Sequence, residues 1–424
     1  MPPILAYADE VTSSTNQPSR RQHGLHRMTG RDPNESHRAA TPLELLYDLT
    51  FVVAFSIAGA QLTHALAENH PVQGVLAFSF AVVAIVWAWI NHSWFASAYD
   101  TDDWLMRVAT LVQMVGVLIL GLGLPEMFEG ILEGHLTNRI MVVGYVILRV
   151  SQIFLWLRAS RDDPEHRTTM RGYAVSISIA QLLWILVAWL QPALPVAIPL
   201  MLAVIAFEFG SVRACERRFG GSPWHPHHIA ERYGLLAIIS LGEIVLGTTT
   251  AIEAVVAEQG WSREAVLIAI AGVSLAFAMW WTYFGQPFGE ILEKRPEKSF
   301  GFGYGHVLLY GSIAAVGAGL HVAAYYIEDK TKIGETEVML TMAVPLALFM
   351  VVVYALWHFL MPGRDPVHWL LLGLMLVVLA VSVAMPALGA SLGWSIVVLM
   401  VVPWITVVGY ETVGVRKIDE HLGT

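Results

Sequence analysis

The sequence predicts an all-α membrane protein, a polytopic bundle of about twelve transmembrane helices. Three observations support this fold class. The mean hydropathy is +0.58, hydrophobic residues make up 56% of the 424 residues, and charged residues make up only 14%. A soluble globule of this size would lack the polar surface needed to cover itself. The chain also offers roughly twelve apolar runs, each near the length of about 20 residues that crosses a bilayer.

The apolar runs define the expected helices in chain order, and short polar breaks separate them. The expected spans are residues 43–66, 74–95, 104–124, 139–158, 172–190, 194–213, 231–252, 263–284, 304–327, 337–361, 366–388 and 393–412. The N-terminus lacks a charged region followed by a long apolar core, so it is not a cleavable signal peptide. We expect a disordered cytoplasmic tail (1–40), a first six-helix half (41–213), a cytoplasmic connecting loop (214–230), a second half (231–412) and a short cytoplasmic tail (413–424).

The distribution of basic residues supports this count and predicts an orientation. Cytoplasmic loops of membrane proteins are enriched in Lys and Arg. With both termini in the cytoplasm, most of the 25 Lys and Arg residues fall on the cytoplasmic side. The exceptions are four on the other side (Arg139, Arg263, Lys330 and Lys332) and two inside spans (Arg107 and Arg149). We therefore expect a multi-pass protein of the cell (plasma) membrane with cytoplasmic N- and C-termini.

An even number of spans is compatible with two parallel six-helix repeats. The first span opens with ELLYDLTFVVAF and the seventh with ERYGLLAIISLGE, so each begins on a glutamate. The second span carries WAWINHSWF and the eighth MWWTYF. Tryptophan is also a general anchor at membrane interfaces, which leaves a repeat and ordinary anchoring as alternative interpretations.

Two carboxylates lie at the start of the first span. Glu44 and Asp48 are four residues apart, so they share a helical face at the cytoplasmic entrance. Glu44 can be explained by the positive dipole at a helix N-terminus, whereas Asp48 lies beyond the first turn. His64 is about 30 Å from Glu44 along the helix axis, which excludes a metal site made of these three side chains.

The deepest ionisable groups are a carboxylate and a guanidinium. Glu243 lies twelve residues into the seventh span, near the membrane midplane, and Arg149 lies in the middle of the fourth. A guanidinium at that depth needs an acidic partner or water. Glu243, Asp48 and Glu208 are the candidate partners, and Glu243 matches Arg149 best in depth. A structural ion pair and a pair that opens for a proton or an anion are the two interpretations.

The cytoplasmic turn SAYDTDDWLMR is acidic where basic residues are expected. An N-cap at Asp102 or Asp103 accounts for one carboxylate. The others can clamp an arginine as a gating latch or hold a hydrated cation, and we favour the latch. The predicted latch residues are Asp100, Asp102, Asp103, Arg107, Glu231 and Arg232.

Other motifs give weaker signals. His225, His227 and His228 precede the seventh span, but their spacing fits no established zinc pattern and no cysteine assists. The chain contains no phosphate loop, nucleophile elbow or dinucleotide fingerprint. There is no cationic stripe of the kind that binds nucleic acid. We predict no catalytic residue, no metal and no cofactor.

Several stretches together resemble the low-temperature-requirement protein A (LtrA) family of membrane proteins. They are LELLYDLTFVVAF, WAWINHSWFASAYDTDDWLMR, HHIAERYGLLAIISLGEIVLG and MWWTYF. The resemblance as a whole covers spans one to nine. The resemblance implies that the family pattern falls on Glu44, Asp48, Asp100, Asp102, Asp103, Arg107, Glu231, Arg232 and Glu243. The family name refers to growth at low temperature, which implies a role in stress adaptation and no substrate.

Three functional hypotheses follow. The leading one is a secondary transporter or ion permease whose pathway includes Glu44, Asp48, Arg149 and Glu243. In it, Glu243 is the protonatable group and Arg149 its counter-charge or an anion anchor. The alternatives are an intramembrane enzyme acting on a lipid or isoprenoid, with Glu44 and Asp48 as acid and base, and a non-catalytic scaffold or sensor. The expected partners are the lipid bilayer and a proton, ion or small solute, and an oligomer is compatible with the sequence.

Overall fold

A computed structural model of the chain describes residues 24–33, 35, 38–361 and 366–414. These residues form α-helices joined by short loops, and they contain no β-strand. The helices are α1 (Pro42–Ala67), α2 (Pro71–Tyr99), α3 (Trp104–Leu122), α4 (Leu124–Leu132), α5 (Arg139–Asp162), α6 (Arg167–Leu190), α7 (Leu194–Phe219), α8 (Pro226–Gln259), α9 (Arg263–Phe284), α10 (Phe288–Lys294), α11 (Ser299–Ile327), α12 (Glu335–Leu360), α13 (Pro366–Ala384) and α14 (Leu392–Gly409).

The twelve predicted spans are confirmed in the described residues, because twelve helical segments are long and apolar enough to cross a membrane. Several of their bounds differ from the prediction, and the third and seventh spans are two examples. The third span continues to Leu132 through α4, after a break at Gly123, where a Cβ atom would lie 2.2 Å from the Met141 backbone nitrogen. The seventh span is longer than predicted, since α8 begins at Pro226 and runs for 34 residues.

Capping residues explain where several helices begin. Thr41 caps α1 and forms a capping box with Glu44, and Pro42 follows at the first helical position. Asp103 caps α3 by accepting a hydrogen bond from the Met106 amide, and Ser262 caps α9 in the same way through the Ala265 amide. These contacts satisfy amides that have no partner inside their helices.

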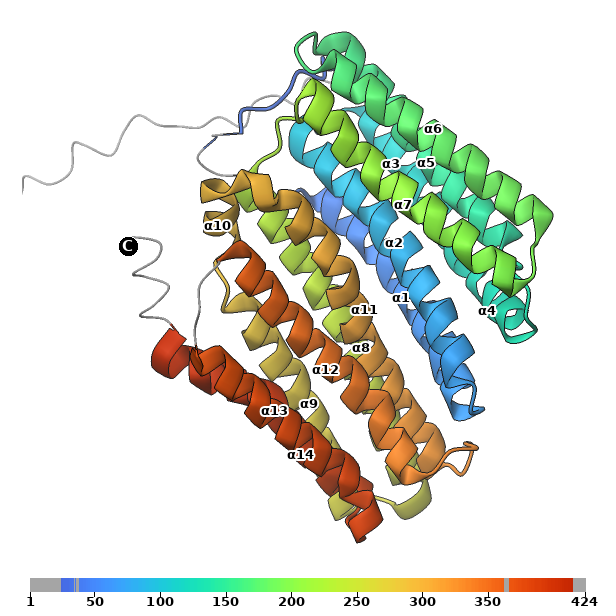
Figure 1. Cartoon of the computed structure of the whole chain (residues 1–424), viewed down its shortest axis with the longest axis vertical. Coiled ribbons are helices and arrows are strands. Elements are labelled where there is room, and N and C mark those ends of the chain that lie inside the picture. Colours follow the sequence, from blue (N-terminus) through green and yellow to red (C-terminus); the bar gives the residue numbers. More distant parts are fainter. Residues whose placement is uncertain (1–23, 34, 36–37, 362–365, 415–424) are drawn as a thin grey trace, which may run out of the picture.

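Helices α1, α2, α8 and α11 form the centre of the bundle (Figure 1). Helices α3 to α7 lie on one side of them, and α9 and α12 to α14 lie on the other. Helices α8 and α11 approach each other closely, because a Cβ atom on Gly247 would lie 2.6 Å from the Gly317 carbonyl oxygen. Glycine at such a crossing lets two membrane helices approach closely. Helix α13 is the least buried span, so most of its apolar side chains face outward.

The described part of the N-terminal segment packs against the end of the bundle at which α1 begins, called here the N-terminal end. Met28 is fully buried, and its amide donates to Asp162 Oδ2 over 3.0 Å. The Arg31 amide donates to the Ala98 carbonyl oxygen over 3.1 Å. Within the predicted tail (1–40), residues 24–33 therefore contact the bundle through Met28 and Arg31, and residues 1–23, 34 and 36–37 lie outside the described part.

Candidate functional site

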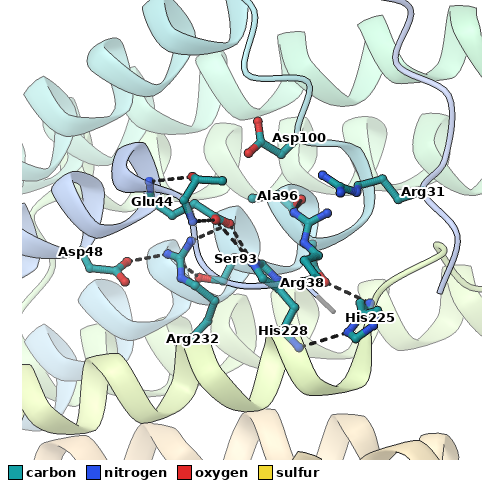
Figure 2. A network of polar contacts seen from close by, with 12 residues as sticks. Arg31, Arg38, Glu44, Asp48, Ser93, Ala96, Asp100, His225, His228 and Arg232 are labelled. Atoms are coloured by element: carbon teal, nitrogen blue, oxygen red, sulfur yellow. Dashed lines mark hydrogen bonds and ion pairs between the residues drawn. The ribbon is translucent and has the colours of Figure 1, made fainter. Parts of the chain in front are cut away.

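A cluster of buried charges lies at the N-terminal end, where α1, α2 and α8 meet (Figure 2). Arg232 of α8 is fully buried and contacts both carboxylates of α1. Its Nη1 atom lies 2.8 Å from Glu44 Oε1, and its Nη2 atom donates to Asp48 Oδ1 over 2.5 Å. The three side chains therefore connect the first half of the chain to the second.

Further side chains hold each member of this cluster, which we call the Arg232 cluster. The Trp89 indole Nε1 donates to Asp48 Oδ1 over 2.7 Å, and the Arg232 guanidinium lies 5.7 Å from the Trp89 ring centroid. The His228 Nε2 atom lies 3.2 Å from Glu44 Oε1. A buried charge is tolerated only when such partners compensate it, and each carboxylate here contacts the Arg232 guanidinium. Among the described residues, Asp48 Oδ2 and Arg232 Nε have no hydrogen-bond partner.

Glu44 has two roles in the structure. Its Oε2 atom accepts a hydrogen bond from the Thr41 amide over 2.7 Å, which completes the cap of α1. Its other oxygen contacts Arg232. The structure therefore places Glu44 both at the start of α1 and in the buried charge cluster. Asp48, one turn further along, has no capping role, and its partners are Arg232 and Trp89.

The N-terminal segment covers the Arg232 cluster from outside (Figure 2). The Arg38 guanidinium is buried, and its Nη2 atom donates to the Ala96 carbonyl oxygen over 2.6 Å. His225 Nε2 lies 2.9 Å from the Glu35 carbonyl oxygen, which joins this segment to the start of α8. Burial raises the pKa of Asp100 to about 6, and the nearby Glu44 carboxylate acts in the same direction.

The acidic turn forms two separate ion pairs. Asp102 accepts two hydrogen bonds of 2.9 Å from Arg107, and both side chains are exposed. Asp103 pairs with Arg158 of α5 and accepts from the His26 amide over 3.2 Å. Burial alone would raise the pKa of Asp103, but hydrogen bonds from Arg158 and the Met106 and His26 amides lower it to about 2.

The predicted latch is therefore divided. Asp102 and Arg107 contact each other as expected, but Arg232 belongs to the buried cluster on α8 rather than to the turn. Glu231 is exposed and forms no ion pair in the described residues, because the helix turns by about 100° between it and the buried Arg232. The sequence did not identify Arg158 as the partner of Asp103, since more than fifty residues separate them.

Glu243 lies at the crossing of α1, α8 and α11. Its Oε1 atom accepts a hydrogen bond from the Ser56 hydroxyl over 2.5 Å. A Cβ atom on Gly59 would lie 3.7 Å from Glu243 Oε2, and one on Gly317 would lie 2.9 Å from the Glu243 Cβ atom. Glu243 is 4% exposed, and among the described residues no Lys, Arg or His forms an ion pair with it.

The prediction that Arg149 pairs with Glu243 is wrong. Arg149 Nη2 donates to the Tyr145 hydroxyl over 2.6 Å and lies 3.4 Å from Glu208 Oε1. The Tyr145 hydroxyl in turn contacts Glu208 Oε2 over 3.1 Å. Glu208 was one of the three candidates, and depth alone could not select it because depth does not show which helices lie side by side.

The three histidines before the seventh span point to different partners. His225 caps α8 through the His228 amide, His227 lies 3.1 Å from Glu293, and His228 contacts Glu44. In the part of the chain that the structure describes, no group of three His, Cys, Asp or Glu side chains is arranged to hold a metal ion.

Comparison with known proteins identifies the family. The model of the bacterial low temperature requirement A protein (LtrA) family matches residues 39–403. The chain belongs to the LtrA family. The LtrA match extends further than the stretches noticed in the sequence, because it reaches into α14. The chain is also similar to an uncharacterized protein of Rhizobium meliloti (strain 1021), with 26% identity over 313 residues that cover 70% of this chain and 73% of the relative.

Proposed function

We propose that this LtrA protein is a secondary transporter or ion permease of the cell membrane, and that Glu243 is its proton-binding group. One observation carries the proposal. Glu243 is a buried carboxyl group in the middle of a membrane helix, and its recorded side-chain partner is a serine hydroxyl rather than a cation. A carboxylate there would carry an uncompensated charge, which is costly inside a bilayer. A bound proton removes that charge.

The position of Glu243 fits this role. Ser56 belongs to the first half of the chain and Glu243 to the second, so their hydrogen bond joins the two halves. Transporters commonly place coupling groups near the midplane, between two halves that move against each other. The Arg232 cluster joins the same halves about 16 Å nearer the N-terminal end, as the eleven residues of helix between Arg232 and Glu243 imply. We propose that the Arg232 cluster closes the N-terminal end of the bundle while Glu243 holds a proton.

The distribution of basic residues supports a cytoplasmic location for the N-terminal end. We propose that both termini lie on that side. The even number of spans agrees with this arrangement.

A scaffold is the second candidate function, and the Arg232 cluster favours it. Its ion pairs join α1 to α8, as expected if their role is to hold these helices together. The enzyme hypothesis is less well supported, because Glu44 and Asp48 both contact Arg232 and neither is left as an unpaired acid or base.

The experiment that separates these functions is ion flux in liposomes. The wild-type protein is reconstituted in vesicles that contain a pH-sensitive dye. A pH gradient is imposed together with a gradient of sodium, potassium or an anion, and we expect the dye to report proton flux. Glu243→Gln should abolish this flux while keeping the fold. Glu253→Gln is a matched control, because Glu253 lies on the same helix but is exposed. A folded wild-type protein without flux of protons or any of these ions would refute transport and favour the scaffold.

A further inference from the structure

A cavity lies between the two halves of the bundle, towards the N-terminal end. Its volume is about 50 Å³, which is room for about three or four water-sized groups. Helices α2, α5, α6 and α7 line it on one side, and α11 of the second half lines it on the other. The acidic side chain in its lining is Glu216 of α7. Six aromatic side chains also line the cavity: Trp87, Trp94, Trp156, Tyr173, Phe300 and Tyr304.

The aromatic rings pack in two groups that meet at this cavity. The ring centroid of Tyr304 lies 5.6 Å from that of Trp87 and 5.7 Å from that of Phe300. The Trp156 and Tyr173 centroids lie 4.8 Å apart. Trp87, Trp156 and Tyr173 are each at most 4% exposed, whereas the aromatic residues that anchor a protein at a membrane interface face the lipid. These rings therefore enclose an internal space.

Glu216 places a carboxylate at this space without a basic partner from the protein. Its Oε1 atom accepts a hydrogen bond from the Tyr173 hydroxyl over 2.5 Å. In the described part of the chain, no Lys, Arg or His forms an ion pair with Glu216, and its side chain is half-buried. A carboxylate that is partly removed from water is stabilised by a cation beside it, so the cavity is a suitable place for one.

The cavity also adjoins a hydrogen-bond donor that lacks a partner. The Trp156 indole Nε1 atom has none among the described residues, although a buried indole N–H usually finds one. The other polar groups on these rings contact protein. Trp94 Nε1 donates to the Tyr233 hydroxyl over 3.0 Å, and the Tyr304 hydroxyl donates to the Phe209 carbonyl oxygen over 2.8 Å. An oxygen atom inside the cavity can therefore serve as the acceptor for Trp156.

We propose that this cavity binds a small organic ammonium ion with alkyl groups on its nitrogen, of which choline is an example. Aromatic rings attract such a cation when it lies within about 6 Å of their centroids, and Glu216 supplies the opposite charge. The choline hydroxyl also offers Trp156 an acceptor. A proton would neutralise Glu216 without filling the cavity. A hard metal cation prefers several oxygen ligands, which a wall of aromatic rings does not provide.

Identifying the ammonium ion as the transported solute rests on the proposed function, whereas its binding does not. Trp94 contacts Tyr233, which precedes Glu243 on α8 by about 15 Å along the helix axis. The ammonium site and the proton site are therefore separate. Exchange of one ammonium ion for one proton would move no net charge. Binding and flux can be tested independently of each other.

Ammonium binding is measured by isothermal titration calorimetry on the detergent-purified full-length protein. Choline chloride and methylammonium chloride are titrated at constant ionic strength, with sodium chloride as the blank. The neutral analogue of choline is 3,3-dimethyl-1-butanol, which has carbon in place of nitrogen and almost the same shape. We expect saturable binding of choline, and binding of the neutral analogue at least about tenfold weaker, because the analogue lacks the charge that pairs with the carboxylate.

Two variants test the carboxylate and the rings. Glu216→Gln keeps the side-chain size and an acceptor for Tyr173, so it should fold and bind choline at least about tenfold more weakly. Phe300→Leu keeps an apolar contact but removes one ring, so the affinity should fall about two- to fivefold. The matched controls are Glu165→Gln, an exposed carboxylate between α5 and α6, and Phe154→Leu, an exposed ring on α5. Both should bind choline like the wild type.

Three outcomes would overturn the proposal. One is the absence of saturable binding of both choline and methylammonium to the folded wild-type protein. Another is equal affinity for choline and its neutral analogue, a comparison that needs no variant. The third is unchanged choline affinity in a folded Glu216→Gln protein. Choline binding without flux would reject the proposed transport but keep this site, whereas proton flux without binding of either ammonium ion would do the reverse.

Discussion

Replacement of Arg232 is the perturbation whose effect the structure defines best. Arg232→Gln removes the guanidinium that contacts both Glu44 and Asp48. Both carboxylates are nearly inaccessible, at 2% and 1% exposure, so water cannot replace the lost partner. Breaking a buried ion pair by removing one member lowers the free energy of unfolding by about 3–5 kcal/mol. Because two carboxylates lose their counter-charge, we expect a loss at the upper end of this range.

The acidic partners should show smaller effects. Asp48→Asn leaves Arg232 paired with Glu44 and keeps an oxygen that can accept from Trp89, so we expect about 3 kcal/mol or less. The triple variant Glu44→Gln, Asp48→Asn, Arg232→Gln leaves no unpaired charge. It should therefore be more stable than Arg232→Gln alone, with a coupling free energy of about 0.5–3 kcal/mol.

The assay is reversible unfolding in mixed micelles, followed by tryptophan fluorescence. The expected order of stability is wild type, then Asp48→Asn and the triple variant, then Arg232→Gln. A free energy of unfolding for Arg232→Gln within about 1 kcal/mol of the wild type would refute the reasoning, because it would mean that water or another group already compensates the carboxylates. The exposed pair of Asp102 and Arg107 is a suitable comparison, and Arg107→Gln should leave stability unchanged.

Three further predictions concern pH and packing. The pKa of Asp103 is depressed, so the stability that its carboxylate contributes is full above the ordinary aspartate pKa near 3.9 and is lost as the pH falls towards about 2. The melting temperatures of wild type and Asp103→Asn should therefore converge as the pH falls from about 4 to about 2. The pKa of Asp100 is raised, so the stability that its protonated form contributes is full below about pH 3.9 and is lost as the pH rises through about 6. The melting temperature of Asp100→Asn should therefore equal that of the wild type at about pH 4 and exceed it at about pH 7. Equal melting temperatures at both pH values would contradict this. Gly317→Ala should lower the free energy of unfolding by about 1–3 kcal/mol, because its Cβ atom would lie 2.6 Å from the backbone of Glu243. Gly242→Ala is its control, since no atom lies within 4 Å of the added Cβ, and a similar loss there would argue against crowding as the cause.

Much of the fold could be predicted because membrane helices obey a simple length rule. Each span of about 20 apolar residues appears directly in the sequence, and the twelve predicted spans agree with the described helices. Helix caps were also predictable where a single residue explains them, as at Asp103. The break at Gly123 was missed although the sequence contains a signal for it, because Pro125 at the start of α4 lacks the amide that would continue α3. The close approach of Met141 to Gly123 could not be read from the sequence.

The candidate site was predictable only in part. The cost of burying charge singled out Glu44, Asp48, Arg149 and Glu243 correctly as side chains inside the bundle. Their pairing depends on which helices are neighbours, and a single sequence contains little information about that. Depth along the membrane favoured Glu243 as the partner of Arg149. In the structure, however, the helices that carry these two residues have different neighbouring helices, so the two side chains have different partners. The roles of Trp89 and Ser56 were also missed, because both residue types are common in membrane helices.

The measurement that tests the central claim most directly is the charge movement caused by proton binding at Glu243. Proteoliposomes are adsorbed on a supported membrane, and the transient current after a pH jump is recorded without any solute gradient. The account predicts a transient current for the wild type and for Glu253→Gln, and none for Glu243→Gln. An unchanged current in a folded Glu243→Gln protein, or no current in the folded wild type, would contradict proton binding at this carboxyl group.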